Sequence, residues 1–171
     1  MCIKLKVPQH GEGRWKTGGE RSWMLESFAD ADWSANKKHR KPTSSAIHFI
    51  NGNFAHASSR TQRVVSLSSA ESELHNMISG CSDGICIKRC LQFWVNETVE
   101  QIQWTDNSAA RQLVCRQGVG RIHHVGGKLL WIQGLVLEKG ISVGQVPTEW
   151  NYYILISSVQ NPCTELECLC C

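Results

Sequence analysis

Apolar and polar residues alternate along five short stretches of the chain, and each alternation predicts a β-strand. The five stretches are residues 23–30, 45–50, 54–57, 99–105 and 141–146. Asn51 and Gly52 separate the second stretch from the third, and both residue types tolerate a positive φ. We therefore expect the second and third strands to form a tight antiparallel hairpin.

Another stretch places apolar residues three and four positions apart, which is typical of an amphipathic helix. It runs from about Ser69 to Val95, and its apolar face consists of Leu74, Met77, Ile78, Cys81 and Ile85. Gly80 and Gly84 are the points where this helix would be interrupted, because each glycine weakens a helix by about 1 kcal/mol relative to alanine.

Two shorter helices are also predicted. The first covers residues 109–114 and follows Asp106, Asn107 and Ser108, which are residue types that start helices. The second runs from about residue 124 to residue 138, and its apolar positions are Leu129, Leu130, Ile132, Leu135 and Val136. Three antiparallel strands, a helix, a strand, helices and a last strand predict an α/β fold with a mixed sheet.

The order of the elements places two acids at one edge of this sheet. Asp30 ends the first strand and Asp106 follows the fourth. A right-handed crossover through the long helix makes these two strands parallel neighbours, so both acids emerge at the carboxyl ends of adjacent strands. This edge is where α/β sheets place ligands.

A third acid, Glu73, lies at the start of the long helix. Ser68 and Glu71 fit a capping box, in which the hydroxyl and the carboxylate satisfy free backbone N–H groups. Glu71 therefore has a structural role and Glu73 has none. Because Glu73 borders the apolar face, its carboxylate is costly to desolvate unless a cation or hydrogen-bond donors meet it.

Three carboxylates at one edge would repel one another unless cations lay between them. Mg²⁺ prefers carboxylate oxygens, and two such ions about 3.5–4 Å apart support in-line displacement at phosphorus. Asp30, Glu73 and Asp106 thus suggest phosphodiester hydrolysis. Their spacing alone leaves open the alternative that they are helix caps and turn formers, which are common roles of acids at strand ends.

Five motifs carry a resemblance to a known family. In chain order they are SFADADWS (27–34), RKPTS (40–44), LSSAESEL (67–74), TDNSAA (105–110) and VPTE (146–149). They closely resemble the ribonuclease H region of copia-type LTR retrotransposon Pol polyproteins, where the motifs read like SDADW, RKSTS, LSSTEAEY, CDNQSA and VPTE in the same order. The resemblance spans roughly residues 26–151.

This resemblance implies a ribonuclease H-like fold, with a mixed five-stranded sheet flanked by helices. It also implies cleavage of the RNA strand of RNA/DNA hybrids with two Mg²⁺ ions, or Mn²⁺. The catalytic metal ligands fall on Asp30, Glu73 and Asp106. Asp32 competes with Asp30 for this role and is interpreted as a turn or supporting residue, and Glu71 competes with Glu73 but serves as a cap. The implied partners are an RNA/DNA hybrid and the upstream reverse transcriptase region of the same polyprotein.

One departure from the family affects the expected activity. The family follows VPTE with a segment like NxADILTK, whose aspartate is the fourth metal ligand and begins a closing helix, whereas this chain has Ile154 at that position. We expect weakened or absent activity and no closing helix. Residues 1–21 are interpreted as a connector from an upstream polyprotein region, residues 22–150 as the ribonuclease H-like domain, and residues 151–171 as an aberrant, disordered tail such as a frameshift would produce. The alternative is a noncatalytic nucleic-acid-binding or structural remnant of a decayed element.

Basic residues around the acids are candidates for phosphate contacts. They are Lys37, Lys38, Arg40, Lys41, Arg60, Arg63, Arg121 and His124. The run at residues 37–41 has the alternative interpretation of a solvated loop, and His124 matches a family histidine but could equally have a structural role. The salt dependence of binding would test these contacts.

Composition adds few constraints. The chain has 171 residues, 42% apolar and 19% charged, with a net charge of +3, which fits one globular domain and does not by itself indicate nucleic-acid binding. We find no segment long enough to span a membrane and no signal-peptide pattern at residues 1–6, so we expect no membrane association and an intracellular location, in a cytoplasmic particle or the nucleus.

Cysteines and tryptophans are expected to serve packing. Cys2, Cys81, Cys86, Cys90 and Cys115 are interpreted as reduced, small apolar residues. The remaining four cysteines crowd residues 163–171, where zinc binding competes with an accidental tail. The tryptophans at positions 23, 94, 104 and 131 are expected on core faces.

Overall fold

The computed structural model describes residues 23–32, 42–62, 66, 68–118, 120 and 126–147. Several residues named above lie outside these ranges. They are Cys2, Lys37, Lys38, Arg40, Lys41, Arg63, Arg121, His124, Ile154 and the four cysteines of residues 163–171. The expectations for the connector and for the tail after residue 150 also concern residues outside the described part of the chain.

Five strands form one mixed sheet, as the sequence predicts. They are β1 (Trp23–Asp32), β2 (Thr43–Ile50), β3 (Asn53–Thr61), β4 (Val99–Thr105) and β5 (Ser142–Gln145). Their order across the sheet is β3-β2-β1-β4-β5. β1 and β2, like β2 and β3, are antiparallel, whereas β4 is parallel to both β1 and β5. The predicted parallel pairing of the strands that end near Asp30 and Asp106 is therefore confirmed.

The β2–β3 hairpin turns at Asn51 and Gly52, as predicted. Both residues have a positive φ, of 49° and 77°, which is the backbone geometry that tight hairpin turns require. The turn is also tied to the neighbouring strand, because the Asn51 N–H donates to the Met24 carbonyl and Asn51 Oδ1 accepts from the Met24 N–H, both over 2.9 Å.

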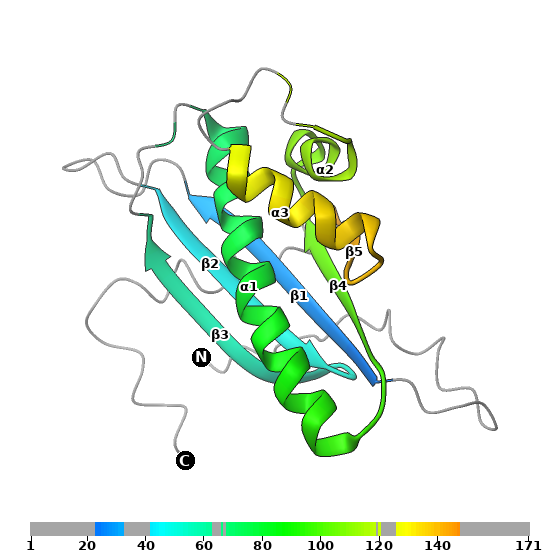
Figure 1. The fold of residues 1–171 in the computed structure, drawn as a ribbon. Helices are drawn as coiled ribbons and strands as arrows, with labels where there is room; N and C mark the ends of the chain where they lie inside the picture. The colour runs from blue at the N-terminus through cyan, green and yellow to red at the C-terminus, as the bar shows by residue number, and fades with distance from the viewer. Residues whose placement is uncertain are drawn as a thin grey trace, which may run out of the picture.

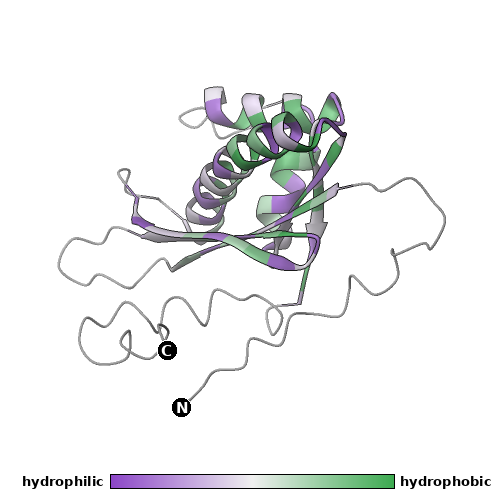
Figure 2. Cartoon of the chain, turned by 90° about the horizontal axis from the view of Figure 1, so that it is seen from below, coloured by the Kyte–Doolittle hydropathy of each residue, from purple (hydrophilic) through white to green (hydrophobic). Residues whose placement is uncertain are grey.

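The helices α1 (Ser69–Val95), α2 (Ser108–Cys115) and α3 (Gly126–Leu137) lie on one face of the sheet (Figures 1 and 2). α1 contacts β1, β2 and β4, and α3 crosses the half of α1 nearer its start. The main apolar core lies between the helices and β5. Its buried residues are Leu74, Met77, Cys81, Ala110, Val114, Leu129, Ile132 and Ile141. The predicted apolar face of the long helix is thus confirmed.

Gly80 and Gly84 do not interrupt α1, which is one continuous helix from Ser69 to Val95. A Cβ atom at Gly80 would lie 3.2 Å from the Cβ of Ala29. A Cβ atom at Gly84 would lie 2.9 Å from Ser27 Oγ and would also collide with the side-chain amide of Gln101. The two glycines therefore let the helix lie close to the sheet, and this tertiary packing offsets their low helix propensity.

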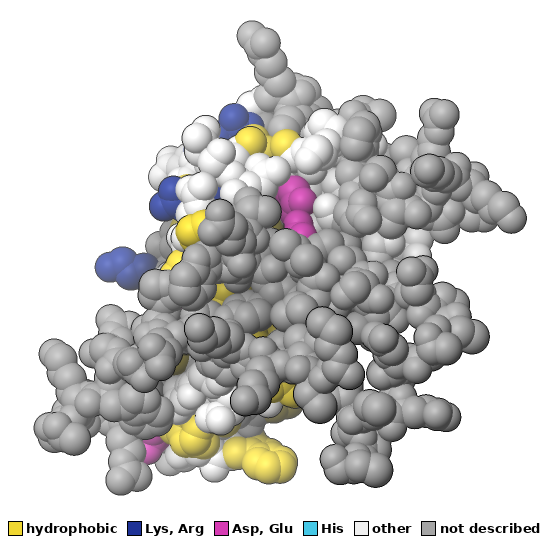
Figure 3. All heavy atoms as spheres, turned by 180° about the vertical axis from the view of Figure 1, so that it is seen from behind, with side chains coloured by type: hydrophobic (Ala, Val, Ile, Leu, Met, Phe, Trp, Pro, Cys, Tyr) yellow, Lys and Arg dark blue, Asp and Glu magenta, His cyan; other side chains and the backbone are white. Residues whose placement is uncertain are grey.

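A second apolar cluster lies on the opposite face of the sheet. Phe28, Ile47 and Phe49 are buried there, and Trp104 and Val146 pack against them. The rings of Phe28 and Trp104 are stacked with centroids 6.2 Å apart. Figure 3 shows hydrophobic side chains on this face. β1 therefore buries side chains on both of its faces rather than on one.

Some residues predicted to pack in the core are instead exposed. Trp94 has 85% of its surface exposed, Leu130 51% and Trp131 42%. Cys86, Cys90 and Cys115 are exposed as well, so Cys81 is the one buried cysteine among the described residues. Trp94 lies in the last turn of α1, and Figure 1 shows that this half of the helix extends beyond the part that α3 covers.

Within the described ranges, none of the helices combines the length and the apolar character that crossing a bilayer requires.

Candidate metal centre

Three carboxylates from three elements meet at one edge of the sheet. Asp30 lies near the end of β1, Asp106 directly follows β4, and Glu73 lies in the second turn of α1. One ligand oxygen from each residue lies within 4.8 Å of the corresponding oxygens of the other two. Glu73 is buried, whereas Asp30 and Asp106 are partly exposed. The structure therefore brings together the three acids that the sequence singles out.

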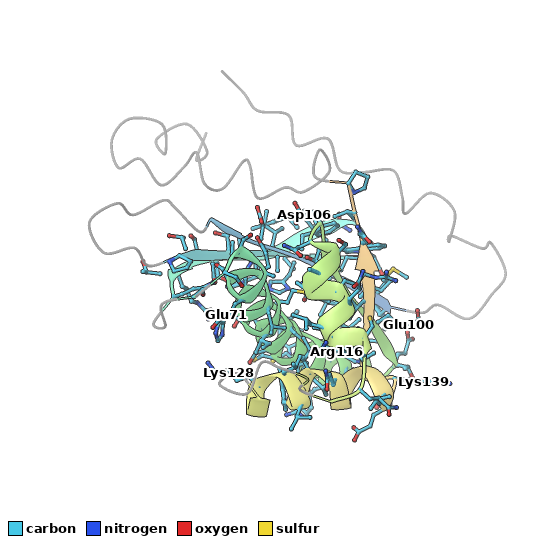
Figure 4. The ribbon with its side chains drawn as sticks, turned by 90° about the horizontal axis from the view of Figure 1, so that it is seen from above. Glu71, Glu100, Asp106, Arg116, Lys128 and Lys139 are labelled. Atoms are coloured by element: carbon cyan, nitrogen blue, oxygen red, sulfur yellow. The ribbon has the colours of Figure 1, made fainter. Side chains whose placement is uncertain are left out.

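The parallel pairing of β1 and β4 accounts for the proximity of the two aspartates. Phe28 is directly opposite Trp104, and each acid lies two residues further along its segment, so Asp30 and Asp106 reach the same end of the sheet. Figure 1 shows that α1 begins at the same end of the sheet, and Figure 4 labels Asp106 at the start of α2.

The start of α1 separates the roles of Glu71 and Glu73. Ser68 is the N-cap, and its Oγ accepts a hydrogen bond from the Glu71 N–H over 3.2 Å. The Glu71 carboxylate lies 3.7 Å from Nε2 of His75, one turn further along the helix. Glu71 is thus engaged within its own helix, and the three-acid cluster contains Glu73 instead.

The start of α2 likewise leaves the Asp106 carboxylate outside the cap. Asn107 is the N-cap, and its Oδ1 accepts from the Ala110 N–H over 3.0 Å. The Asn107 N–H in turn donates to Thr105 Oγ1 over 3.2 Å. Because its neighbours make the cap, Asp106 needs no structural role in the helix start.

At the end of β1, one backbone group contacts two of the acids. The Ala31 N–H lies 2.9 Å from Asp30 Oδ1 and 3.3 Å from Glu73 Oε1. Among the side chains that the structure describes, Asp30 is therefore the aspartate of this segment in the cluster. Of its competitor Asp32, the structure describes only the backbone, which pairs with Thr43.

The electrostatics of the cluster favour the binding of a positive charge. Burial raises the pKa of Glu73 from 4.5 to about 9, and the negative charge of Asp30, a hydrogen bond with the Asp30 side chain and the negative charge of Asp106 add to the shift, whereas the Ala31 N–H opposes it. Glu73 Oε2 is buried and has no hydrogen-bond partner among the described residues. A divalent cation would neutralise the repulsion and would supply this oxygen with a ligand bond. The residues present thus fit a hard ion such as Mg²⁺ or Mn²⁺.

Arg60 is the one predicted phosphate contact within the described residues. It is opposite Ser44, which is opposite Ala31, so Arg60 lies at the acidic end of the sheet but two strands away from β1. Its guanidinium forms an ion pair with Asp83 of α1, with Nη2 and Oδ2 2.9 Å apart. Part of its charge is therefore already compensated within the protein.

Two buried amides near the cluster were not predicted. Gln62 follows β3 and contacts α1, which carries Glu73. Asn76 lies on α1 itself and contacts β2, the strand beside Asp30. The sequence contains one weak signal for Asn76, which is a polar residue between the apolar positions Leu74 and Met77. For Gln62 it contains none.

Comparison with known proteins shows a likeness in structure alone, since neither a protein-family model nor a curated protein sequence matches the chain. The N-terminal RNase H domain of a Mycobacterium tuberculosis protein, solved as a fusion with maltose-binding protein, superposes with a TM-score of 0.51 at 14% identity. The match covers 76% of this chain and 86% of that one.

Two further solved structures give similar values. RNase H1 of the halophilic archaeon Halobacterium salinarum has a TM-score of 0.50 at 10% identity, over 75% of this chain and 89% of its own. LC11-RNase H1 in complex with an RNA/DNA hybrid has a TM-score of 0.50 at 16% identity, over 77% and 89%. At such low identities the likeness shows the fold, which is ribonuclease H-like, as predicted.

Proposed function

We propose that this ribonuclease H-like domain is a metal-dependent ribonuclease H, which hydrolyses the RNA strand of RNA/DNA hybrids at Asp30, Glu73 and Asp106. The observation that carries the proposal is the meeting of three carboxylate oxygens within 4.8 Å at the carboxyl ends of β1 and β4. The fold is consistent with it, and one of the similar structures was solved with an RNA/DNA hybrid.

The three acids differ in burial, and this difference suggests which side of the proposed metal site each acid forms. Glu73 is buried and would hold an ion from the helix side, whereas Asp30 and Asp106 are partly exposed and would hold it from the side that a substrate can reach. Two bound divalent ions would activate the attacking water and stabilise the leaving oxygen of the phosphodiester. The carboxylates themselves bind and space the ions, and they need not exchange protons with the substrate.

The basic residues would hold the hybrid beside the acids. We propose phosphate contacts for Lys37, Lys38, Arg40, Lys41, Arg60, Arg63, Arg121 and His124. Contacts of this kind are independent of base sequence, so recognition would depend on the shape of the hybrid and on its 2′-hydroxyl groups.

We also propose an origin, a partner and a location for the domain. The five motifs support an origin in a copia-type retrotransposon Pol polyprotein, with the reverse transcriptase region as the upstream partner and a cytoplasmic particle or the nucleus as the location. Ile154 in place of a fourth acid supports weakened activity. The same substitution favours a second candidate function, which is noncatalytic binding of nucleic acid by a remnant of a decayed element.

A cleavage assay on a labelled RNA/DNA hybrid separates the two functions. The enzyme should cut the RNA strand with Mg²⁺ or Mn²⁺, stop with EDTA, and lose its activity in the Glu73→Gln variant. Changing Ile154 to Asp, together with a family-like tail, should increase cleavage. Binding of the hybrid without cleavage, before and after this change, would support the noncatalytic remnant and would contradict the proposed enzyme.

A further inference from the structure

A buried amide joins the end of β3 to the start of α1. Gln62 is 8% exposed, and its Nε2 donates to the Ser72 carbonyl over 2.9 Å and to Ser44 Oγ over 2.8 Å. Its Oε1 accepts from Ser66 Oγ over 3.0 Å, and its backbone N–H donates to the Pro42 carbonyl over 2.8 Å. Hydrogen bonds therefore hold both the amide nitrogen and the amide oxygen of the side chain. One of these bonds goes to Ser72, the residue directly before Glu73.

A second amide makes the reverse connection, from the helix to the sheet. Asn76 is fully buried, and its Nδ2 donates to the Ser45 carbonyl over 3.1 Å. Ser45 is directly opposite Asp30 in the β1–β2 pairing. The two amides therefore contact the helix on either side of Glu73, at Ser72 and at Asn76, and both tie it to β2, the strand that pairs with the Asp30 segment.

Glu73 needs such support because the forces on it are unfavourable. Its carboxylate is buried beside two other acids, and whenever it is ionised the like charges push the helix start away from the sheet. Glu73 also directly follows the first turn of α1, and the first turn of a helix frays easily because it lacks part of the backbone hydrogen bonding. Among the described contacts, Glu73 Oε1 meets the sheet through the Ala31 N–H at 3.3 Å, which is a long hydrogen bond.

We propose that Gln62, supported by Asn76, is a positioning residue that holds Glu73 at the distance from Asp30 and Asp106 at which the three carboxylates share metal ions. The inference rests on the proposed function as far as the ions are concerned. Neither amide belongs to the acidic cluster, so each acts through the placement of Glu73 and not on the substrate. Metal sites depend on such supporting shells, because an error of about 0.5 Å in a ligand position impairs them.

The chain offers a matched control in Gln133. This glutamine is 3% exposed, and its Nε2 donates to the Leu113 carbonyl over 2.8 Å and to the Gly118 carbonyl over 3.1 Å. It has the same chemistry and a similar burial as Gln62, but it ties α3 to the end of α2 instead of holding α1. Gln62→Met and Gln133→Met should therefore cost similar stability, and only Gln62→Met should disturb Glu73.

The first experiment measures amide hydrogen exchange by NMR in the full chain without metal, with each variant compared at equal global stability. Gln62→Met should raise the exchange rates of the Ala31, Ser72 and Glu73 amides at least tenfold, and Gln133→Met should not. Unchanged protection in Gln62→Met would overturn the proposal. If Gln62→Met does not fold, Gln62→Asn shortens the side chain by one methylene and keeps its polarity.

The second experiment measures Mn²⁺ binding, from the electron paramagnetic resonance signal of the free ion, together with cleavage kinetics. Gln62→Met should bind Mn²⁺ at least tenfold more weakly and lower kcat, with KM for the hybrid unchanged, while Gln133→Met retains wild-type values. Equal Mn²⁺ affinity in Gln62→Met and wild type would overturn the positioning role alone. A wild type that binds no Mn²⁺ would overturn the proposed function and the positioning role with it.

Discussion

The Ala31 backbone N–H donates to Glu73 Oε1 over 3.3 Å, although 42 residues separate the two in sequence. This contact joins the end of β1 to the start of α1, and it lies where Asp106 also arrives from β4. The proposed metal site is therefore an assembly of three chain segments that only folding brings together.

The variant Glu73→Gln should stabilise the protein in the absence of metal. Burial raises the pKa of Glu73 to about 9, and the neighbouring Asp30 and Asp106 add to this shift. Between pH 4.5 and pH 9 the folded state therefore retains a proton that the unfolded state releases. The unfolding free energy of the wild type therefore falls as pH rises through this range. With EDTA at pH 8, urea unfolding should show Glu73→Gln to be more stable by at least about 1 kcal/mol.

Bound metal should make the wild type more stable than Glu73→Gln, because bound cations favour the ionised carboxylate. Saturating Mn²⁺ should raise the melting temperature of the wild type and leave that of Glu73→Gln nearly unchanged. The same urea midpoint for both proteins with EDTA, at pH 5 and at pH 8, would contradict the expected repulsion.

A separate pH dependence should arise from His48. Burial lowers its pKa from 6.5 to about 4, and the positive charges of His56 and Arg60 add to the effect, whereas Asp83 opposes it. The unfolded state binds more protons between these values, so the unfolding free energy should fall as pH decreases from 6.5 towards 4. Urea unfolding in a Glu73→Gln background isolates this contribution from that of Glu73.

The control for this prediction removes the imidazole. His48 Nδ1 lies 2.8 Å from Ser27 Oγ, and a glutamine keeps a polar group near that hydroxyl. His48→Gln should therefore flatten the dependence between pH 4 and 6.5. An unchanged slope in the variant would assign the effect to other groups.

Alanine at Gly84 should destabilise the fold even though alanine favours helices. The new Cβ would lie 2.9 Å from Ser27 Oγ and would collide with Gln101, which forces α1 away from the sheet. Overpacking of this kind typically costs about 1–3 kcal/mol, which exceeds the gain of about 1 kcal/mol in helix propensity. Thermal and urea unfolding measure the difference.

Gly134 in α3 is the matched position for that test. A Cβ atom there would meet nothing within 4 Å, so Gly134→Ala should stabilise the protein by about 0.5–1 kcal/mol. A gain in stability from Gly84→Ala as well would show that α1 does not need the close approach.

The Arg60–Asp83 ion pair should influence binding of the hybrid more than stability. The side chain of Arg60 is 56% exposed, and exposed ion pairs contribute little to folding. Arg60→Ala should reduce the salt slope of hybrid binding by about one, whereas Asp83→Asn should leave the guanidinium free for phosphate and strengthen binding. Fluorescence anisotropy over a range of salt concentrations measures both effects, and equal slopes in all three proteins would contradict a phosphate contact.

Much of the local structure could be predicted from the sequence. The bounds of α1, the turn at Asn51 and Gly52 and the alternation along β4 follow from interactions between residues close in the chain. The handedness of the crossover then places Asp30 and Asp106 at one edge of the sheet, because a right-handed connection makes their strands parallel neighbours.

Only the tertiary structure decided what covers each residue and how closely. Periodicity indicates that a residue lies on the apolar face of a helix, but not how far along the helix a neighbouring element covers that face. Trp94 is exposed because it lies in the half of α1 beyond the part that α3 covers. Helix propensity predicts that Gly84 weakens the helix, whereas the close packing of α1 on Ser27 requires a residue without a Cβ atom at this position. The role of Gln62 depends on distances to residues brought near by folding, and a single sequence does not contain those distances.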